Sequence, residues 1–163
     1  MTAAVVAIAV EPPDSAAARA CLRVYFAELA ERFEGGFDPG KGGAAADLAM
    51  AEPTGRFLIA RIDGQPVGCG GLKRIGPGIG EIKRMWVDRQ ARGLGIARRL
   101  LDALEAEAGR MQLHRIRLDT NGALGEAQAM YRKAGYVEID RYNDNPYAQV
   151  FFEKVLNAES DRR

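Results

Sequence analysis

The sequence is poor in the residues that build metal sites and disulfide frameworks. Its 163 residues include one histidine, His114, and two cysteines. Cys21 and Cys69 lie on separate apolar segments with no CxxC spacing, so we expect buried, reduced thiols. A structural zinc site needs clustered Cys or His ligands, and the sequence therefore predicts no metal centre.

The sequence also lacks an excess of charge and a long apolar run. Its 23 basic and 22 acidic residues give a net charge of +1, whereas nucleic-acid-binding domains usually carry a basic excess. No run approaches the roughly 20 apolar residues of a membrane-spanning helix. The apolar N-terminal run has no basic segment before it and is followed by Glu11-Pro12-Pro13, which argues against a signal peptide. We therefore expect a cytoplasmic protein with no nucleic-acid or membrane partner.

The composition that remains is that of a globular domain. Apolar residues make up 47% and charged residues 28%, and a chain of this length buries a substantial core in one domain. We expect a single mixed α/β (α+β) domain over 1–163, with its core at about 5–156. Periodicity and turn residues predict strands at about 5–10, 56–62, 66–73, 80–87, 113–120, 136–142 and 148–155, and helices at about 15–34, 44–51, from 93 onward, and 124–134.

The stretch from Glu81 to Ala97, EIKRMWVDRQARGLGIA, combines a strand, a tight basic turn and a helix that opens at Gly93-Leu94-Gly95. Unpaired N–H groups at a helix start form an anion site, and glycines let a phosphate approach the backbone. The spacing is not that of a dinucleotide-binding fingerprint, because the third glycine would fall at Arg98. Gly40-Lys41 is not a P-loop, because glycine follows the lysine where Ser or Thr is required. The motif alone leaves open a glycine-rich turn without a ligand.

Segments around this motif supply its context. Gln90 to Gly95 matches a Q/R-x-x-G-x-G/A signature, and it follows a strand that ends in Met85-Trp86-Val87. Downstream, LDTN at 118–121 and EAQAMYRKAGY at 126–136 form a second pair of matching segments, a strand end and the helix after it. In these segments, and in the order of its elements over about 5–156, the chain resembles the GNAT family of N-acetyltransferases.

This resemblance implies a GNAT fold, with a central mixed, mostly antiparallel seven-stranded sheet flanked by about four helices. It also implies an acyltransferase that moves an acetyl group from acetyl-CoA (coenzyme A) to a primary amine. Direct attack in a ternary complex is expected rather than a covalent acetyl-enzyme, because neither cysteine has a histidine near it in sequence. A non-catalytic acyl-CoA-binding regulatory or interaction module with the same fold is the alternative. Family habit suggests a homodimer, which the residues themselves do not decide.

The resemblance assigns the cofactor mainly to backbone groups. The pantetheine arm would pair with Met85 and Val87 like an added strand, and Met85 N–H would stabilise the oxyanion. The pyrophosphate would lie on the turn and the helix start, with Arg92 or Arg89 adding positive charge. Asn121 would either bind the cofactor or cap the following helix. The expected cofactor-binding residues are Met85, Trp86, Val87, Arg92, Gly93, Leu94, Gly95, Ile96, Ala97 and Asn121.

Two residues are expected to carry the proton transfers. By resemblance, Tyr131 is the general acid that protonates the CoA thiolate, since a phenol of pKa about 10 stays protonated at neutral pH and can donate to a thiolate of pKa about 8.5. Glu81 matches a catalytic glutamate of several family members and is the candidate base. Core packing is the alternative for Tyr131. The alternatives for Glu81 are a solvated residue at the start of its strand and an ion pair with Lys83. Period two would place Glu81, Lys83 and Met85 on one face of the strand.

The acceptor site is the least determined part. In the family it is shaped by the first helix-loop and the last hairpin, which here contain aromatic rings and carboxylates that suit a cationic amine with an apolar body. Small-molecule and protein amines both remain open, and ordinary loop residues are the alternative for each side chain. The expected substrate-binding residues are Glu34, Phe37, Tyr142 and Asp144, and the same loops contain Phe33, Asp38, Asn143 and Tyr147.

Overall fold

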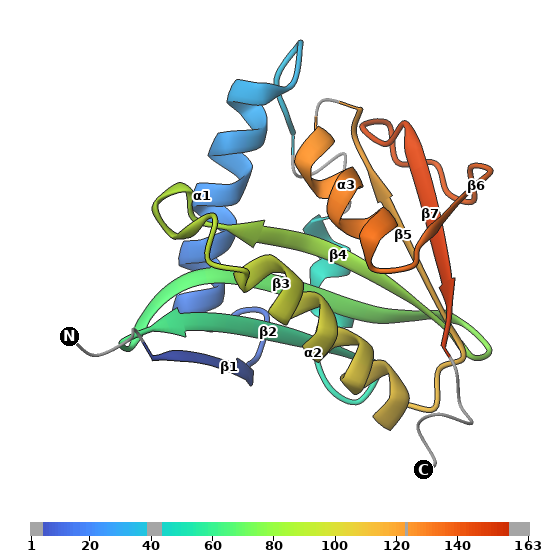
Figure 1. The fold of residues 1–163 in the computed structure, drawn as a ribbon, viewed down its shortest axis with the longest axis horizontal. Coiled ribbons are helices and arrows are strands. Elements are labelled where there is room, and N and C mark those ends of the chain that lie inside the picture. The colour runs from blue at the N-terminus through green and yellow to red at the C-terminus, as the bar shows by residue number, and fades with distance from the viewer. Residues whose placement is uncertain (1–4, 39–43, 123, 157–163) are drawn as a thin grey trace.

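The computed structural model describes residues 5–38, 44–122 and 124–156. Seven strands form one sheet in the order β1-β2-β3-β4-β5-β7-β6 (Figure 1). Every neighbouring pair is antiparallel except β4 and β5, which are parallel. The predicted seven-stranded, mostly antiparallel sheet is therefore confirmed. The strands are β1 (Val6–Val10), β2 (Gly55–Ile62), β3 (Gln65–Gly76), β4 (Ile79–Val87), β5 (Arg115–Thr120), β6 (Val137–Ile139) and β7 (Val150–Val155).

Three α-helices in the described residues cover this sheet: α1 (Ala16–Arg32), α2 (Ile96–Arg110) and α3 (Gly125–Lys133). The helices α2 and α3 pack on one face and α1 on the other (Figure 1). Helix α1 begins where predicted, because the Ser15 hydroxyl accepts a hydrogen bond from Ala18 N–H at 3.0 Å. Over the described stretches, no helix combines the length and the apolar character needed to cross a membrane.

The expectation of about four helices is wrong, because the segment predicted as a helix at 44–51 is a 3₁₀-helix, η1 (Ala44–Met50). A segment this short is not held as an α-helix by its own hydrogen bonds, so tertiary packing decides its conformation. Here Met50 is 1% exposed and packs with core residues of β2 and β3. A second 3₁₀ turn, η2 (Arg89–Ala91), follows β4.

Alternation along β2 divides the apolar core between the two faces of the sheet. Leu58 joins the core beneath α2 and α3, while Phe57 and Ile59 join a second core beneath α1. The second core also contains Cys21 from α1 and Cys69 from β3. Both cysteines are buried, as their apolar segments predicted, and both are free thiols.

The parallel pair of strands separates partway along its length. Strands β4 and β5 are paired only from Ile79 with Arg115 to Ile82 with Leu118, although β4 continues to Val87. The other side of β5 stays paired with β7 to the end of the strand. On the side that faces β5, the second half of β4 therefore has no strand partner among the described residues.

A β-bulge lies at the same point of β4. Arg84 and Met85 lie opposite the single residue Gly70 of β3, and Arg84 has a φ of 60°, which is uncommon for a residue with a side chain. A Cβ at Gly70 would lie 2.6 Å from the Met85 sulfur, so the Met85 side chain occupies the space that the glycine leaves. Met85 consequently packs with the core beneath α2, whereas Lys83 stays near Glu81 on the α1 side. The prediction that Glu81, Lys83 and Met85 share one face is wrong, because period two fails across a bulge.

The strand ends also differ from the prediction. Strand β6 ends at Ile139 rather than at 142, because its pairing with β7 stops there and side-chain contacts take over. Tyr142 hydrogen-bonds to the buried Glu81, and Arg141 binds main-chain carbonyl oxygens of its own loop. Strand β3 is longer than its predicted range of 66–73, since its pairing with β4 continues to Gly76.

Gly55, the first residue of β2, tests how tightly η1 packs against the sheet. A Cβ at this position would overlap the carbonyl oxygens of Ala49 and Leu72, and main-chain atoms cannot move aside as a side-chain tip can. We expect Gly55→Ala to lower the free energy of unfolding by about 1–3 kcal/mol in a denaturant titration. Gly109→Ala in α2 is the control, since its Cβ meets no neighbouring element and should raise stability by up to about 1 kcal/mol. Equal stability of Gly55→Ala and wild type would contradict this packing.

Candidate functional site

A cavity of about 360 Å³ lies between α1, the second half of β4, the start of α2 and α3. Segments that are far apart in the sequence, before α2 and after β5, therefore line the same cavity. The predicted site residues in its wall are Met85, Trp86, Val87, Arg92, Gly93, Ala97 and Tyr131. The rest of the wall is formed by Tyr25, Glu28, Leu29, Arg32, Leu124, Glu126, Ala127 and Met130.

The start of α2 is open at its backbone and has no side-chain cap. Gly95 is the N-cap with a φ of 76°, and Gly93 has a φ of 84°. A Cβ at either glycine would meet no atom within 4 Å, so there is free space in front of both. The unpaired N–H groups of the first turn and the positive end of the helix dipole favour an anion there. Leu94, Gly95 and Ile96 lie outside the cavity wall and Ile96 is 1% exposed, so their contacts would come from the backbone.

The edge of β4 offers a second set of backbone groups to the same cavity. Met85 and Val87 lie beyond Ile82, where pairing with β5 ends, and both line the cavity. An extended chain with amide groups can pair with such an edge like an added strand. The strand edge and the start of α2 together fit a ligand with an extended, amide-bearing arm and an anionic group.

A buried carboxylate holds the basic turn in place. Glu28 of α1 is 8% exposed and accepts hydrogen bonds from Arg92 Nη2 and from Trp86 Nε1, the latter at 3.2 Å. Arg89 is paired with a second carboxylate of α1, Glu31. The two arginines that were expected to add positive charge for a phosphate are therefore already paired with carboxylates. The sequence contains no local signal for Glu28, which looks like one of the outward-facing charges of its helix.

Tyr131 lines the larger cavity from α3. It is 5% exposed, and its ring centroid lies 5.7 Å from that of Tyr136 and 6.1 Å from that of Phe152. Burial raises the pKa of Tyr131, so its hydroxyl is protonated at neutral pH. Tyr131 thus packs in the core, as one interpretation requires, and also lines the cavity, as a general acid would.

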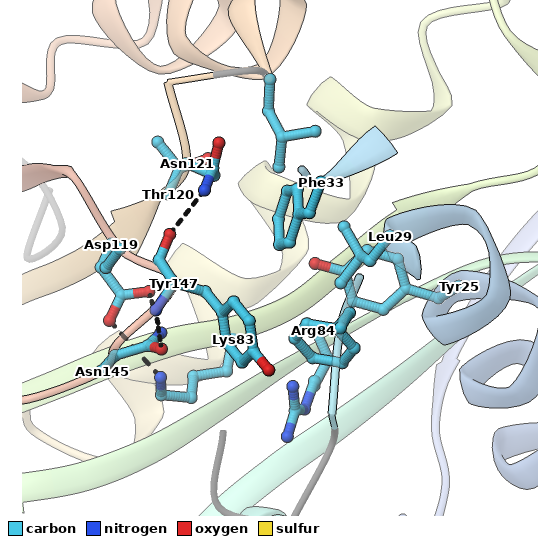
Figure 2. Close-up of a pocket in the computed structure, with 13 residues that line it drawn as sticks. Tyr25, Leu29, Phe33, Lys83, Arg84, Asp119, Thr120, Asn121, Asn145 and Tyr147 are labelled. Atoms are coloured by element: carbon cyan, nitrogen blue, oxygen red, sulfur yellow. Dashed lines mark hydrogen bonds and ion pairs between the residues drawn. The ribbon is translucent and has the colours of Figure 1, made fainter. Parts of the chain in front are cut away.

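A second cavity of about 70 Å³ adjoins the first, and Tyr25, Leu29 and Leu124 belong to the walls of both. Figure 2 shows Tyr25 and Leu29 of α1, together with Phe33 directly after it, on one side of this smaller cavity. The end of β5 and the loop between β6 and β7 supply the opposite side. The other residues of its wall are Phe37, Lys83, Arg84, Asp119, Thr120, Asn121, Asn145, Tyr147 and Ala148.

The candidate base, Glu81, is buried in a polar network. It is 4% exposed, and its carboxylate accepts hydrogen bonds from Tyr142 Oη at 2.6 Å and Asn143 Nδ2 at 3.1 Å. The ammonium groups of Lys73 and Lys83 lie 3.7 and 3.8 Å from it. The predicted ion pair with Lys83 is therefore confirmed. Glu81 is part of neither cavity wall.

The carboxylate in the wall of the smaller cavity belongs to Asp119, at the end of β5. Asn143 Nδ2, which donates to Glu81, also donates to Asp119 at 2.6 Å. Lys83 Nζ lies 3.5 Å from Asp119 and so contacts both carboxylates. Burial and the nearby charge of Glu81 raise the pKa of Tyr142, which keeps its hydroxyl protonated as a donor. Two acidic groups are thereby held together by shared donors.

The predicted acceptor residues come together only in part. Phe37 lines the smaller cavity, and Tyr142 is hydrogen-bonded to Glu81 instead. Glu34 and Asp144 are exposed and belong to neither cavity wall. No group of three or more His, Cys, Asp or Glu side chains in the described ranges is arranged to hold a metal ion.

Asn121 lines the smaller cavity rather than the larger one. Its side-chain amide donates to the carbonyl oxygen of Tyr147 at 2.7 Å. Its main-chain carbonyl oxygen accepts a hydrogen bond from Leu124 N–H at 2.9 Å, in the turn that leads into α3. Asn121 therefore connects this turn to the loop between β6 and β7.

Several wall residues of the smaller cavity were not predicted as site residues. Tyr25 matches the apolar stripe of its helix, and Asp119 matches the polar side of an alternating strand. Lys83 lies on the same side of β4 as Glu81 by ordinary alternation, and Arg84 lies in the bulge itself. The signal that could have located the bulge is Gly70, since a glycine in a strand interior often marks one.

Comparisons with known proteins agree with this geometry. Residues 22–136 match the model of the Acetyltransferase (GNAT) family. The chain is 38% identical to IAA acetyltransferase of Azospirillum brasilense, over 82% of this chain and 90% of that relative. This chain thus covers most of the length of a curated relative.

Solved structures show the same fold. An acetyltransferase of the GNAT family from Staphylococcus aureus superposes with a TM-score of 0.78 at 22% identity, covering 94% of this chain and 100% of the other. A GNAT family acetyltransferase from Elizabethkingia anophelis, with acetyl-CoA bound, gives a TM-score of 0.67 at 16% identity, with 93% and 98% covered. The family match spans the chain from α1 to the end of α3, which includes the split in the sheet and the open start of α2. This chain therefore belongs to the GNAT acetyltransferase family and is an acetyltransferase.

Proposed function

We propose that this enzyme moves the acetyl group of acetyl-CoA to a primary amine by direct attack in a ternary complex. The observation that carries the proposal is the wall shared by the two cavities at Tyr25, Leu29 and Leu124. A cofactor in the larger cavity and an acceptor in the smaller one would meet at this boundary, as direct attack requires. Neither Cys21 nor Cys69 lines either cavity, which argues against transfer through a cysteine.

Backbone groups would hold the cofactor, which supplies the acetyl thioester. The main chain of Met85 and Val87 would pair with the pantetheine arm, and the turn and helix start at 92–97 would bind the pyrophosphate. Met85 N–H would donate to the oxygen on which negative charge develops. Glu28 would keep the turn in register with the strand through its bonds to Arg92 and Trp86.

Tyr131 would protonate the departing thiolate. Its raised pKa means that the hydroxyl carries its proton at neutral pH and is present as a donor when the thiolate forms. Its place in the wall of the cofactor cavity, close to the shared boundary residues of α1 and α3, supports this role.

The acceptor must lose a proton before it attacks. Because an alkylammonium has a pKa of about 10.4, its deprotonation to the neutral amine costs roughly 4–5 kcal/mol at neutral pH. We assign the general base to Glu81, which would act through solvent because it lies outside the cavity wall. Asp119 would receive the acceptor ammonium at the wall, and Lys83 would offset the combined charge of the two carboxylates.

Gly95→Asp tests the anion site at the start of α2. The new side chain would occupy the free space in front of the helix, and its charge would repel a phosphate. We expect acetyl-CoA affinity to fall by roughly 100-fold or more in calorimetry. Gly64→Asp, in the β2–β3 turn, is the control, because Gly64 has a similar positive φ and open surroundings but does not lie at the start of a helix. If Gly95→Asp bound acetyl-CoA as tightly as the wild type, the assignment of the pyrophosphate to this turn would be wrong.

Tyr131→Phe tests the general acid. We expect turnover to fall by roughly 100-fold or more in a thiol-release assay with chemistry limiting, because the thiolate loses its proton donor. Acetyl-CoA affinity should change little. Tyr136→Phe is the matched control, since its hydroxyl donates to Glu105 at 3.0 Å and lies outside both cavities. If Tyr131→Phe turns over as fast as Tyr136→Phe, Tyr131 is not the acid.

Glu81→Gln and Asp119→Asn test the base. We expect each to lower turnover at pH 7 by roughly tenfold or more. The loss should shrink as the pH rises toward the pKa of the acceptor amine, because more of the amine is then already neutral. Glu107→Gln is the control, a carboxylate paired with Arg56 outside both cavities. Loss in Asp119→Asn alone would transfer the base role to Asp119, and normal rates in both would remove the carboxylates from the mechanism.

A further inference from the structure

Aromatic side chains join two loops across the smaller cavity. The ring centroids of Phe37 and Tyr147 are 4.7 Å apart, and those of Phe33 and Tyr147 are 5.8 Å apart. The main-chain N–H of Asp38 donates to Tyr147 Oη at 2.8 Å. We call Phe33, Phe37 and Tyr147 the aromatic roof. It ties the segment after α1 to the loop before β7, and the cavity of about 70 Å³ beside it suits a small acceptor rather than an extended peptide.

Arg84 brings a buried guanidinium to the same cavity. Its side chain is 8% exposed, its Nε donates to Asp47 Oδ1 at 3.0 Å, and it lies 4.8 Å from the centre of the Phe26 ring. The Nη2 atom is also buried, and it has no hydrogen-bond partner among the described residues. A buried donor without a partner is costly, so this atom is a binding point for an acceptor group that accepts hydrogen bonds.

The chemistry of Arg84 favours a carboxylate as that group. The forked N–H groups of a guanidinium suit carboxylate oxygens, and here Nε of the fork is bonded to Asp47 while Nη2 is left for the acceptor. Lys83, the other cation in the wall, is already within ion-pair distance of Glu81 and Asp119. Arg84 is therefore the cation with a donor left to bind an anionic part of the acceptor.

We infer that the acceptor is a small amine that also carries a carboxylate, an amino-acid-like compound whose carboxylate binds Arg84. Its apolar part would pack against the aromatic roof, and its amine would face the boundary with the larger cavity at Tyr25 and Leu29. This inference rests on the proposed acetyl transfer and narrows the acceptor from any primary amine to one chemical class.

The first test compares free amino acids with their own carboxamides in a thiol-release assay on the wild-type enzyme. The amide has the lower amine pKa and so more neutral amine at pH 7, which means that intrinsic reactivity favours the amide. We nevertheless expect kcat/KM to be at least about tenfold higher for the free acid, because only the acid can pair with Arg84. The inference would be overturned if the amide reacted as fast as the free acid. The same holds for a pentapeptide that begins with the same residue.

The second test assigns the preference to Arg84. We expect Arg84→Gln to lower kcat/KM for the acid by about tenfold to 100-fold and to change that for the amide by less than about threefold. Arg84→Lys, which keeps the charge but not the fork, should fall between. Arg115→Gln is the control, an arginine paired with Glu153 outside both cavities. Equal losses for acid and amide would show a structural role and reject the assignment. The wild-type comparison holds even if the Arg84 variants do not fold.

Failure of the proposed function has a different signature. Simple alkylamines without a carboxylate serve as the reference acceptors in the same assay. No thiol release with any amine would reject acetyl transfer and this inference together. Turnover of alkylamines and amides as fast as that of amino acids would keep the proposed function and reject only the inference.

Discussion

The separation of β4 from β5 after Ile82 and Leu118 is the constraint on which the rest of this structure depends. Main-chain N–H and C=O groups in a protein interior need partners, and among the described residues no strand lies beside the second half of β4 on one side. An amide-bearing ligand can supply those partners without any specialised side chain. Both cavities lie along this opening, so the place where the sheet fails to pair is also the place where two ligands can meet.

The bulge in β4 gives the two ligands different surfaces. The left-handed backbone of Arg84 costs on the order of 1–3 kcal/mol, and several contacts offset this cost. Its guanidinium is paired with Asp47 and stacked on Phe26, and the Cys69 thiol donates to its carbonyl oxygen at 3.3 Å. Because the bulge shifts the alternation, Arg84 reaches the smaller cavity while its neighbour Met85 lines the larger one. Two consecutive residues of one strand thus line two different cavities.

Helix α1 connects the same two sites from the other side. Its Glu28 binds Arg92 and Trp86, which fixes the basic turn against the strand end. On the same helix, Leu29, which is the next residue, and Tyr25, about one turn earlier, form part of both cavity walls. A change in the position of α1 would therefore move the basic turn and the shared wall of the two cavities together.

The sequence by itself determined the seven strands and the glycine-rich start of α2, because turn residues, apolar alternation and a strand-turn-helix motif are local features of the chain. Only the tertiary structure decided that Glu81 is buried outside the cavities, that Asp119 and Arg84 line the smaller one, and that η1 is not an α-helix. These outcomes depend on contacts between distant segments, such as the 64 residues that separate Glu28 from Arg92. A periodic pattern records which face of an element is apolar, whereas a bulge or a shared donor depends on which elements pack together.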